Sequence, residues 1–207
     1  MNKYIIEFIG TFFLVLTIGL SANPIAIGVV LAALVYMGGY ISGAHYNPAV
    51  TLAIWMQKKI KPNEAGVYVV VQLIAAIAAA MVYQVIHGDK MIVAPGFRYS
   101  FGAALVAEIV FTFALVSVVL HTAVSKKTAG NNYYGIAIGF ILMAGAFSVG
   151  TISGGAFNPA VGLGPNIYNF GFLSQHWSNL ALYLIGPLLG GFLASYIFGL
   201  TQAKSKK

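Results

Sequence analysis

The chain has no cysteine and very little charge. Of its 207 residues, 7% are charged, only four residues are acidic, and 59% are hydrophobic. Without cysteine, disulfides and thiolate–metal sites are excluded, and the redox compartment is undetermined. A soluble domain carries about 25% charged residues. With a mean hydropathy of +0.87, this chain could not cover a water-facing surface, so the composition predicts an integral membrane protein.

The sequence also lacks the side-chain clusters on which catalysis and cofactor binding depend. It contains no nucleophile–base cluster and no phosphate-binding loop, and His87, His121 and His176 are not spaced like metal ligands. We therefore expect no enzyme activity, no metal and no other cofactor. The net charge of +7 comes from loop lysines, and it predicts topology and contact with membrane lipid rather than binding to nucleic acid.

Six long apolar segments account for most of the chain. Each has the roughly 20 residues that a helix needs to cross about 30 Å of hydrocarbon. We predict membrane-spanning helices at 4–22, 25–43, 65–86, 101–124, 133–152 and 178–200. The first carries Glu7 and is expected to be a retained span rather than a cleaved leader. The predicted fold class is an all-α membrane protein.

Two further apolar segments, 48–57 and 159–168, are only about half as long. At about 1.5 Å per residue, each covers roughly half the bilayer. Both begin with proline directly after asparagine, which is the arrangement of an N-cap followed by proline at the first helical position. We predict two re-entrant half-helices with N-termini at membrane depth. Irregular backbone is tolerated there only where it is buried in protein or lines a water-filled cavity.

The two halves of the chain repeat each other. The phrase at 42–50 closely matches the phrase at 153–161, and both Glu7 and Glu108 stand four residues before a threonine. Each half has three spans and one half-helix, so the two copies should lie in opposite orientations. We predict one channel domain over 1–207, with inverted repeats at about 1–100 and 101–207. Interrupted helices at matching positions of inverted repeats indicate the binding or conduction site.

Loop charges predict the orientation. One side receives nine lysines under this map, whereas the other receives only Lys90 and Arg98. The nine are Lys3, Lys58, Lys59, Lys61, Lys126, Lys127, Lys204, Lys206 and Lys207. This asymmetry predicts that both termini are cytoplasmic.

These motifs resemble those of the aquaporins, the major intrinsic protein family. The resemblance covers essentially the whole chain and includes both Asn-Pro-Ala boxes, the two Glu-x-x-x-Thr openings and Gly186-Pro187 in the last span. The boxes are Asn47, Pro48 and Ala49, and Asn158, Pro159 and Ala160. The resemblance implies six spans, two half-helices that meet in mid-membrane and a homotetramer in which each protomer has its own pore.

The meeting point of the half-helices has a predictable chemistry. Each N-terminus carries about half a positive charge, so the junction should repel cations and protons. Asn47 and Asn158 should cap the half-helices through their side-chain oxygens and present their NH2 groups to the lumen. Apolar side chains such as Val50 should form the rest of the wall. Backbone carbonyls should line a polar stripe at Gly43, Ala44, His45 and Tyr46 and at Ser153, Gly154, Gly155 and Ala156.

Three further residues take roles from the resemblance. Glu7 and Glu108 would brace the backbone of the re-entrant loops, although a proton-relay or ion-coupling role is an open alternative. His45 would anchor its loop and contribute to the lumen near the cytoplasmic mouth, or simply pack there.

The selectivity filter departs from the family pattern. The position after the second box, where most members carry arginine, is Val161, and the other filter positions fall on Ile27, Ala146 and Gly155. Gly162 stands where glycerol facilitators carry aspartate. The sequence therefore meets neither the strict water pattern nor the glycerol pattern. An apolar filter should be wider and should admit small neutral solutes, unless dewetting lowers water flux instead.

The predicted function is passive transport of water and small neutral solutes, such as glycerol, urea, ammonia or hydrogen peroxide, across the plasma membrane. A secondary transporter would also use inverted repeats and broken helices, but it would need coupling groups, and the spans offer only Glu7 and Glu108. A structural membrane protein with a near-closed pore is the other alternative.

Overall fold

The fold was analysed in a computed structural model, which describes residues 1–174 and 176–203. Lys204, Lys206 and Lys207, which contributed to the predicted orientation, lie outside the described residues. The membrane-length helices are α1 (Asn2–Ser21), α2 (Pro24–Ser42), α4 (Pro62–His87), α5 (Phe101–Val119), α6 (Tyr134–Ser153) and α9 (Trp177–Ala203). The shorter elements are α3 (Pro48–Met56), η1 (Leu120–Val124), η2 (Lys126–Thr128), α7 (Pro159–Tyr168) and α8 (Phe170–Leu173).

The six long helices form a bundle with an apolar outer surface. Among the described residues, six helices are long and apolar enough to cross a membrane. Their outward-facing side chains are large and hydrophobic, as at Ile5, Val29 and Phe140, which are about half exposed. In a helix, every backbone polar group is paired within the segment, so these helices can face hydrocarbon. The all-α membrane fold predicted from the sequence is confirmed.

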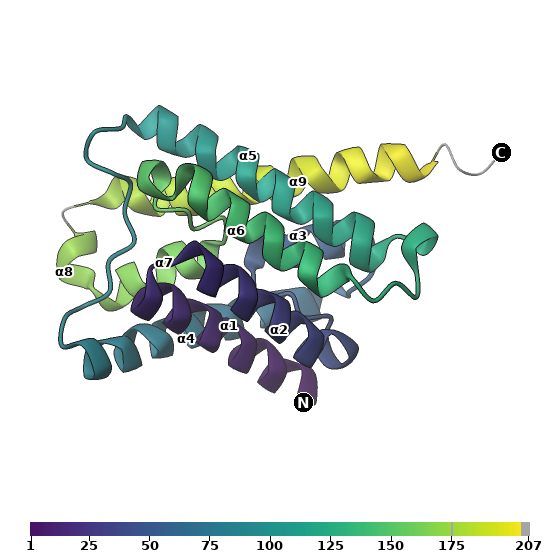
Figure 1. Cartoon of the computed structure of the whole chain (residues 1–207), viewed down its shortest axis with the longest axis horizontal. Coiled ribbons are helices and arrows are strands. Elements are labelled where there is room, and N and C mark those ends of the chain that lie inside the picture. The colour runs from purple at the N-terminus through teal and green to yellow at the C-terminus, as the bar shows by residue number, and fades with distance from the viewer. Residues whose placement is uncertain (175, 204–207) are drawn as a thin grey trace.

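The helices pack in pairs around the two short ones. α1 packs on α2 and α4, α2 on α6, and α5 on α6 and α9, while α3 and α7 each pack between α4 and α9. Figure 1 shows α8 and the segment 88–100 at one end of the bundle, here named the α8 end. The start of α1 and the end of α9 lie toward the opposite end, here named the terminal end, with the turn after α5 (Figure 1).

Glycines allow the helix pairs to approach closely. A Cβ at Gly28 of α2 would lie 2.7 Å from the carbonyl oxygen of Gly139 of α6, and a Cβ at Gly139 would collide with Gly28 in turn. The backbones of α2 and α6 are therefore in direct contact, as expected for small residues at membrane helix interfaces.

The predicted span at 101–124 is not a uniform α-helix. α5 ends at Val119 and continues as the π-helix η1. The hydroxyl of Thr128 donates to the His121 carbonyl at 2.6 Å, and the Asn131 amide donates to the Thr122 carbonyl at 2.7 Å. Side chains of the following turn thus satisfy carbonyls at the end of the helix, where the intrahelical pattern runs out.

Candidate functional site

Both half-helices begin at the asparagines of the repeated motif. The Oδ1 atom of Asn47 accepts a hydrogen bond from the Ala49 amide at 2.8 Å, and Oδ1 of Asn158 accepts one from the Ala160 amide at 2.9 Å. Both asparagines have extended backbone and precede a proline at the first helical position. α3 and α7 therefore have side-chain N-caps, and proline removes one of the amides that would otherwise lack a partner.

The same two asparagines join the half-helices to each other. Nδ2 of Asn47 donates to the carbonyl of Phe157 at 2.9 Å, and Nδ2 of Asn158 donates to the carbonyl of Tyr46 at 2.9 Å. From the sequence, both hydrogens of each side-chain NH2 group were predicted to face the lumen. The structure uses one of its two hydrogens to cross to the opposite loop, so only the second remains for a solute.

Glu7 of α1 braces the loop before α3. Its Oε1 accepts hydrogen bonds from the Ser42 hydroxyl and the His45 amide, at 2.7 and 2.9 Å. Its Oε2 accepts from the Tyr46 amide at 2.7 Å and from the side chain of Gln72 at 2.9 Å. Glu7 is fully buried, so these four donors replace the water that its carboxylate would lose.

Glu108 of α5 has the matching arrangement in the second half. Oε1 accepts from the Ser153 hydroxyl at 2.7 Å and the Ala156 amide at 3.0 Å, and Oε2 accepts from the Phe157 amide at 2.7 Å. This set has three donors, because no side chain takes the place that Gln72 has beside Glu7. The direct hydrogen-bond partners of both carboxylates are hydroxyls, main-chain amides and one side-chain amide, which are the contacts of a structural brace.

The braced loops adopt backbone conformations that most residues avoid. Left-handed φ angles occur at Gly43 (87°), Ala44 (51°) and Tyr46 (52°), and at Gly154 (89°), Gly155 (62°) and Phe157 (46°). For bulky residues such as Tyr46 and Phe157 this conformation is strained and needs support from its surroundings. The carboxylates supply that support by holding the amides of both residues.

Tyr46 also wedges its ring between two spans. A Cβ at Gly10 of α1 or at Gly38 of α2 would collide with the Tyr46 side chain. The Tyr46 hydroxyl donates to the carbonyl of Leu34 at 3.0 Å, and the residue is fully buried. The notch formed by Gly10 and Gly38 therefore holds the loop before α3 against α1 and α2.

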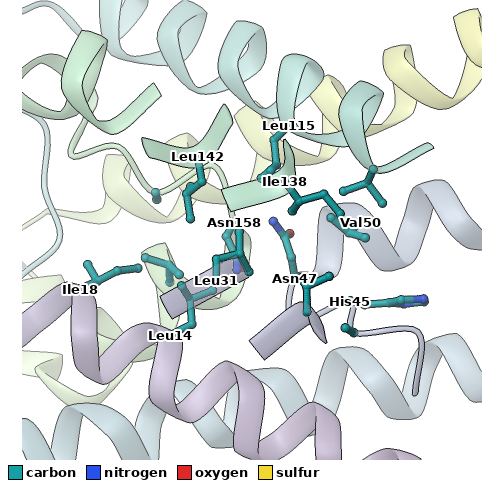
Figure 2. Close-up of a pocket in the computed structure, with 15 residues that line it drawn as sticks. Leu14, Ile18, Leu31, His45, Asn47, Val50, Leu115, Ile138, Leu142 and Asn158 are labelled. Carbon is teal, nitrogen blue, oxygen red and sulfur yellow. The ribbon is translucent and has the colours of Figure 1, made fainter. Parts of the chain in front are cut away.

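A narrow cavity runs past the junction of the half-helices. Its volume, measured as space for the centre of a water molecule, is about 20 Å³, and about 10–15 Å³ on this measure holds one water. It is lined by Leu14, Ile18, Leu31, Val35, Ala44, His45, Asn47, Val50, Leu115, Val119, Ile138, Leu142, Ala156, Asn158 and Val161. The polar side chains in this set are His45, Asn47 and Asn158. Figure 2 shows the two asparagines side by side, with leucines on either side of them. We name this the central cavity.

Wider cavities adjoin the central cavity toward both ends. A cavity of about 290 Å³ at the terminal end shares His45 and Val119 with it, and a cavity of about 520 Å³ at the α8 end shares Ile18. His45 bonds Thr51 through Nδ1 at 3.1 Å and meets the Tyr68 ring edge-on. The narrow, mainly apolar central cavity therefore has a wider cavity on each side.

The predicted filter residues do not all line the same cavity. Ile27, Ala146 and Gly155 line the α8-end cavity, whereas Val161 lines the central cavity and is 2% exposed. No side chain in this set can donate or accept a hydrogen bond. The polar side chains at the α8-end cavity are instead those of Thr151 and Tyr83, and the other polar groups there come from backbone.

The predicted carbonyl stripe is only partly on these cavities. Gly43, Ala44, His45, Gly154, Gly155 and Ala156 line one or more of them. The carbonyls of Tyr46 and Ser153 instead accept hydrogen bonds from Asn158 and from the Tyr183 hydroxyl, at 2.9 and 2.6 Å, and neither residue lines these cavities. The carbonyls of Tyr46 and Ser153 therefore form contacts between elements.

Several contributing residues were missed from the sequence. Gln72 donates to Glu7 and to Thr51, Tyr183 holds the loop before α7, and Asn166 of α7 bonds the segment 88–100. The signal for Gln72 was available, since it is an amide in the middle of a predicted membrane span. Across the described ranges, no group of three or more histidine, aspartate or glutamate side chains could hold a metal ion.

Two capped half-helices inside a bundle of membrane-length helices define a multi-pass membrane protein with a narrow internal path. The chain belongs to the major intrinsic protein family, because the model of that family, "Major intrinsic protein", matches residues 1–198. The resemblance to aquaporins inferred from the motifs is confirmed. Members of this family are channels and not enzymes, so the protein is a membrane channel for water or small solutes.

Individual relatives agree with this assignment. Aquaporin AqpM of Methanothermobacter marburgensis is 31% identical over 236 residues, covering 95% of this chain and 96% of that relative. Aquaporin TIP2-3 of Arabidopsis thaliana is 39% identical over 184 residues, covering 87% and 72%. The crystal structure of the aquaglyceroporin from Plasmodium falciparum matches with a TM-score of 0.74 and 21% identity over 95% of this chain and 93% of that one, which shows a common fold.

Proposed function

We propose that the protein conducts water and small neutral solutes passively and excludes ions and protons. The observation that carries this proposal is the reciprocal bonding of Asn47 and Asn158, which joins two half-helix N-termini at the narrow central cavity. Each N-terminus contributes about half a positive charge. Two of them together oppose the entry of a cation into a space too narrow for its hydration shell.

Proton exclusion follows from the remaining hydrogen of each Asn amide. Both Oδ1 atoms are occupied by the caps, so a water between Asn47 and Asn158 meets donors only. Such a water accepts from the protein and points its own hydrogens away, toward either end of the path. A continuous proton-carrying chain of water molecules is interrupted at that point.

The solute range is proposed to include glycerol, urea, ammonia and hydrogen peroxide as well as water. The support is the absence of a cationic side chain at Val161 and the small or aliphatic side chains at Ile27, Ala146 and Gly155. A filter without a fixed charge discriminates less against small neutral molecules. We further propose a homotetramer in the plasma membrane, as the family resemblance implies. The lysine asymmetry supports cytoplasmic termini.

Flux measurements on reconstituted vesicles test this function. Stopped-flow light scattering should show water permeability above that of protein-free vesicles, with uptake of glycerol and urea that does not saturate and needs no ion gradient. A pH-sensitive dye inside the vesicles should report no added proton leak. Saturable, ion-dependent uptake would identify a secondary transporter, and permeabilities equal to those of empty vesicles would indicate a near-closed pore.

A further inference from the structure

The segment between α4 and α5 crosses the α8 end of the bundle and is fixed there by one side chain. Figure 1 shows this segment, residues 88–100, as an extended connection that spans the end of the bundle. Val93 within it is 5% exposed, and Asn166 of α7 is 1% exposed. Nδ2 of Asn166 donates to the Val93 carbonyl at 2.8 Å, and Oδ1 accepts from the Val93 amide at 3.4 Å.

Both Nδ2 and Oδ1 of Asn166 thus have main-chain partners. Besides Val93, its Nδ2 donates to the carbonyl of Gly162 one helical turn earlier, at 2.8 Å. It pairs with both main-chain groups of Val93, as a neighbouring strand would. Asn166 therefore ties the position of the segment to the half-helix that starts at Asn158.

Ala94 and Gly96, which follow Val93 in the segment, contact the end of α6 and the loop after it. The amide of Gly96 donates to the carbonyl of Ile152 at 3.1 Å. The Ala94 carbonyl oxygen lies 2.8 Å from the point where a Cβ on Gly154 would stand, and Ala94 and Gly154 both line the α8-end cavity. No hydrogen bond to the Ala94 carbonyl is found within residues 1–174 and 176–203. An acceptor without a partner thus lies at the wall of this cavity.

A solute entering from the α8 end needs such an acceptor. The side chains of Ile27 and Ala146 offer no hydrogen-bonding atom to this cavity, whereas Thr151 and Tyr83 bring one hydroxyl each. A neutral solute that leaves bulk water loses partners for its own N–H or O–H groups, and each donor left without a partner is costly. Main-chain carbonyls at the entrance, together with these two hydroxyls, are the acceptors that can replace them.

We propose that Asn166 is a positioning residue for solute selectivity. By holding Val93, it fixes the Ala94 carbonyl as a hydrogen-bond acceptor for the N–H or O–H groups of small neutral solutes at the α8-end entrance. The proposal rests on the proposed function, since it specifies how that channel recognises solutes other than water.

The test compares Asn166→Ala with a matched control at the other end of the bundle. Gln57 likewise holds a neighbouring helix: Nε2 donates to the carbonyl and to the hydroxyl of Ser195, both at 2.8 Å, and Gln57 lines none of the cavities described above. Asn166→Ala should lower glycerol and urea permeability relative to water by roughly threefold to tenfold, the scale of one hydrogen bond. Gln57→Ala should lower the melting temperature without changing that ratio.

A second variant keeps the shape of the side chain and removes its donors. Asn166→Asp cannot donate to Val93 or Gly162, so the glycerol-to-water permeability ratio should again fall. If the alanine variant does not fold, this variant tests the proposal alone. An unchanged or raised ratio, or an equal fall in water and solute flux, would overturn the proposal for Asn166. Wild-type vesicles that pass neither water nor glycerol would refute the proposed function itself.

Discussion

Asn47 donates a hydrogen bond to the loop before Asn158, and Asn158 donates one to the loop before Asn47, both at 2.9 Å. Each residue also caps its own half-helix through Oδ1. One side chain therefore starts a helix and joins it to the other helix. The amide of asparagine suits this dual task because it offers a donor and an acceptor on one short stem.

Loss of either asparagine should destabilise the junction. Asn47→Ala removes an N-cap and one crossing hydrogen bond, and we expect a loss of about 2 kcal/mol. Asn158→Ala should cost a similar amount. In the double variant the loss should be smaller than the sum, because breaking one crossing bond already loosens the other. Thermal unfolding in detergent measures all three, and strictly additive losses would contradict the coupling.

The two bracing carboxylates should differ in their tolerance of substitution. A glutamine at either site turns one acceptor oxygen into an NH2 group that faces donors. Glu7→Gln should lower stability more than Glu108→Gln, by roughly 1 kcal/mol, because Glu7 faces four donors and Glu108 three. The melting temperatures of the two variants measure this difference. A larger loss for Glu108→Gln would show that the number of donors does not determine the loss of stability.

A cation at the apolar filter should restrict larger solutes. Val161→Arg adds charge and length beside a central cavity of about 20 Å³, so glycerol and urea uptake should fall more than water flux. Val161→Leu adds volume without charge and separates narrowing from the electrostatic effect. Stopped-flow measurements on vesicles of equal protein content decide the outcome. Uptake of the larger solutes at or above the wild-type level would refute the filter hypothesis.

The residue after Val161 is restricted by packing. A Cβ at Gly162 would collide with the Tyr183 side chain of α9, so Gly162→Ala should destabilise the protein by about 1–3 kcal/mol. Gly66 of α4 is the control, because its Cβ would meet nothing within 4 Å. Gly66→Ala should be neutral or stabilising by up to about 1 kcal/mol. Equal effects of the two substitutions on the melting temperature would be incompatible with the contact.

The sequence was sufficient to predict the helices. The apolar runs and the Asn-Pro steps depend on local chemistry, so the half-helix predicted at 159–168 has those bounds, and the one predicted at 48–57 ends one residue earlier. Glu7 and Glu108 could be identified because an acid in an apolar span needs a partner. The π-helix at 120–124 has no local sequence signal, and the side chains of Thr128 and Asn131 that bond its carbonyls come from the following turn.

The contacts between the halves were less predictable. The crossing bonds of Asn47 and Asn158 join residues more than 100 positions apart, and no local pattern specifies them. The separation of Val161 from Ile27, Ala146 and Gly155 arises because it lines the central cavity, whereas they line the α8-end cavity. Counting from the Asn-Pro-Ala boxes identifies the filter positions in the sequence, but it does not predict which cavity of the path each side chain lines.

The notch that Gly10 and Gly38 form around Tyr46 has a mechanical consequence. α3 cannot slide along the bundle axis unless the Tyr46 ring is first lifted out from between α1 and α2. The axial position of the central cavity, which Asn47 lines, is thereby tied to the two helices that hold Tyr46. Rotamer changes in the surrounding leucines can roughen its wall but cannot alter its axial position.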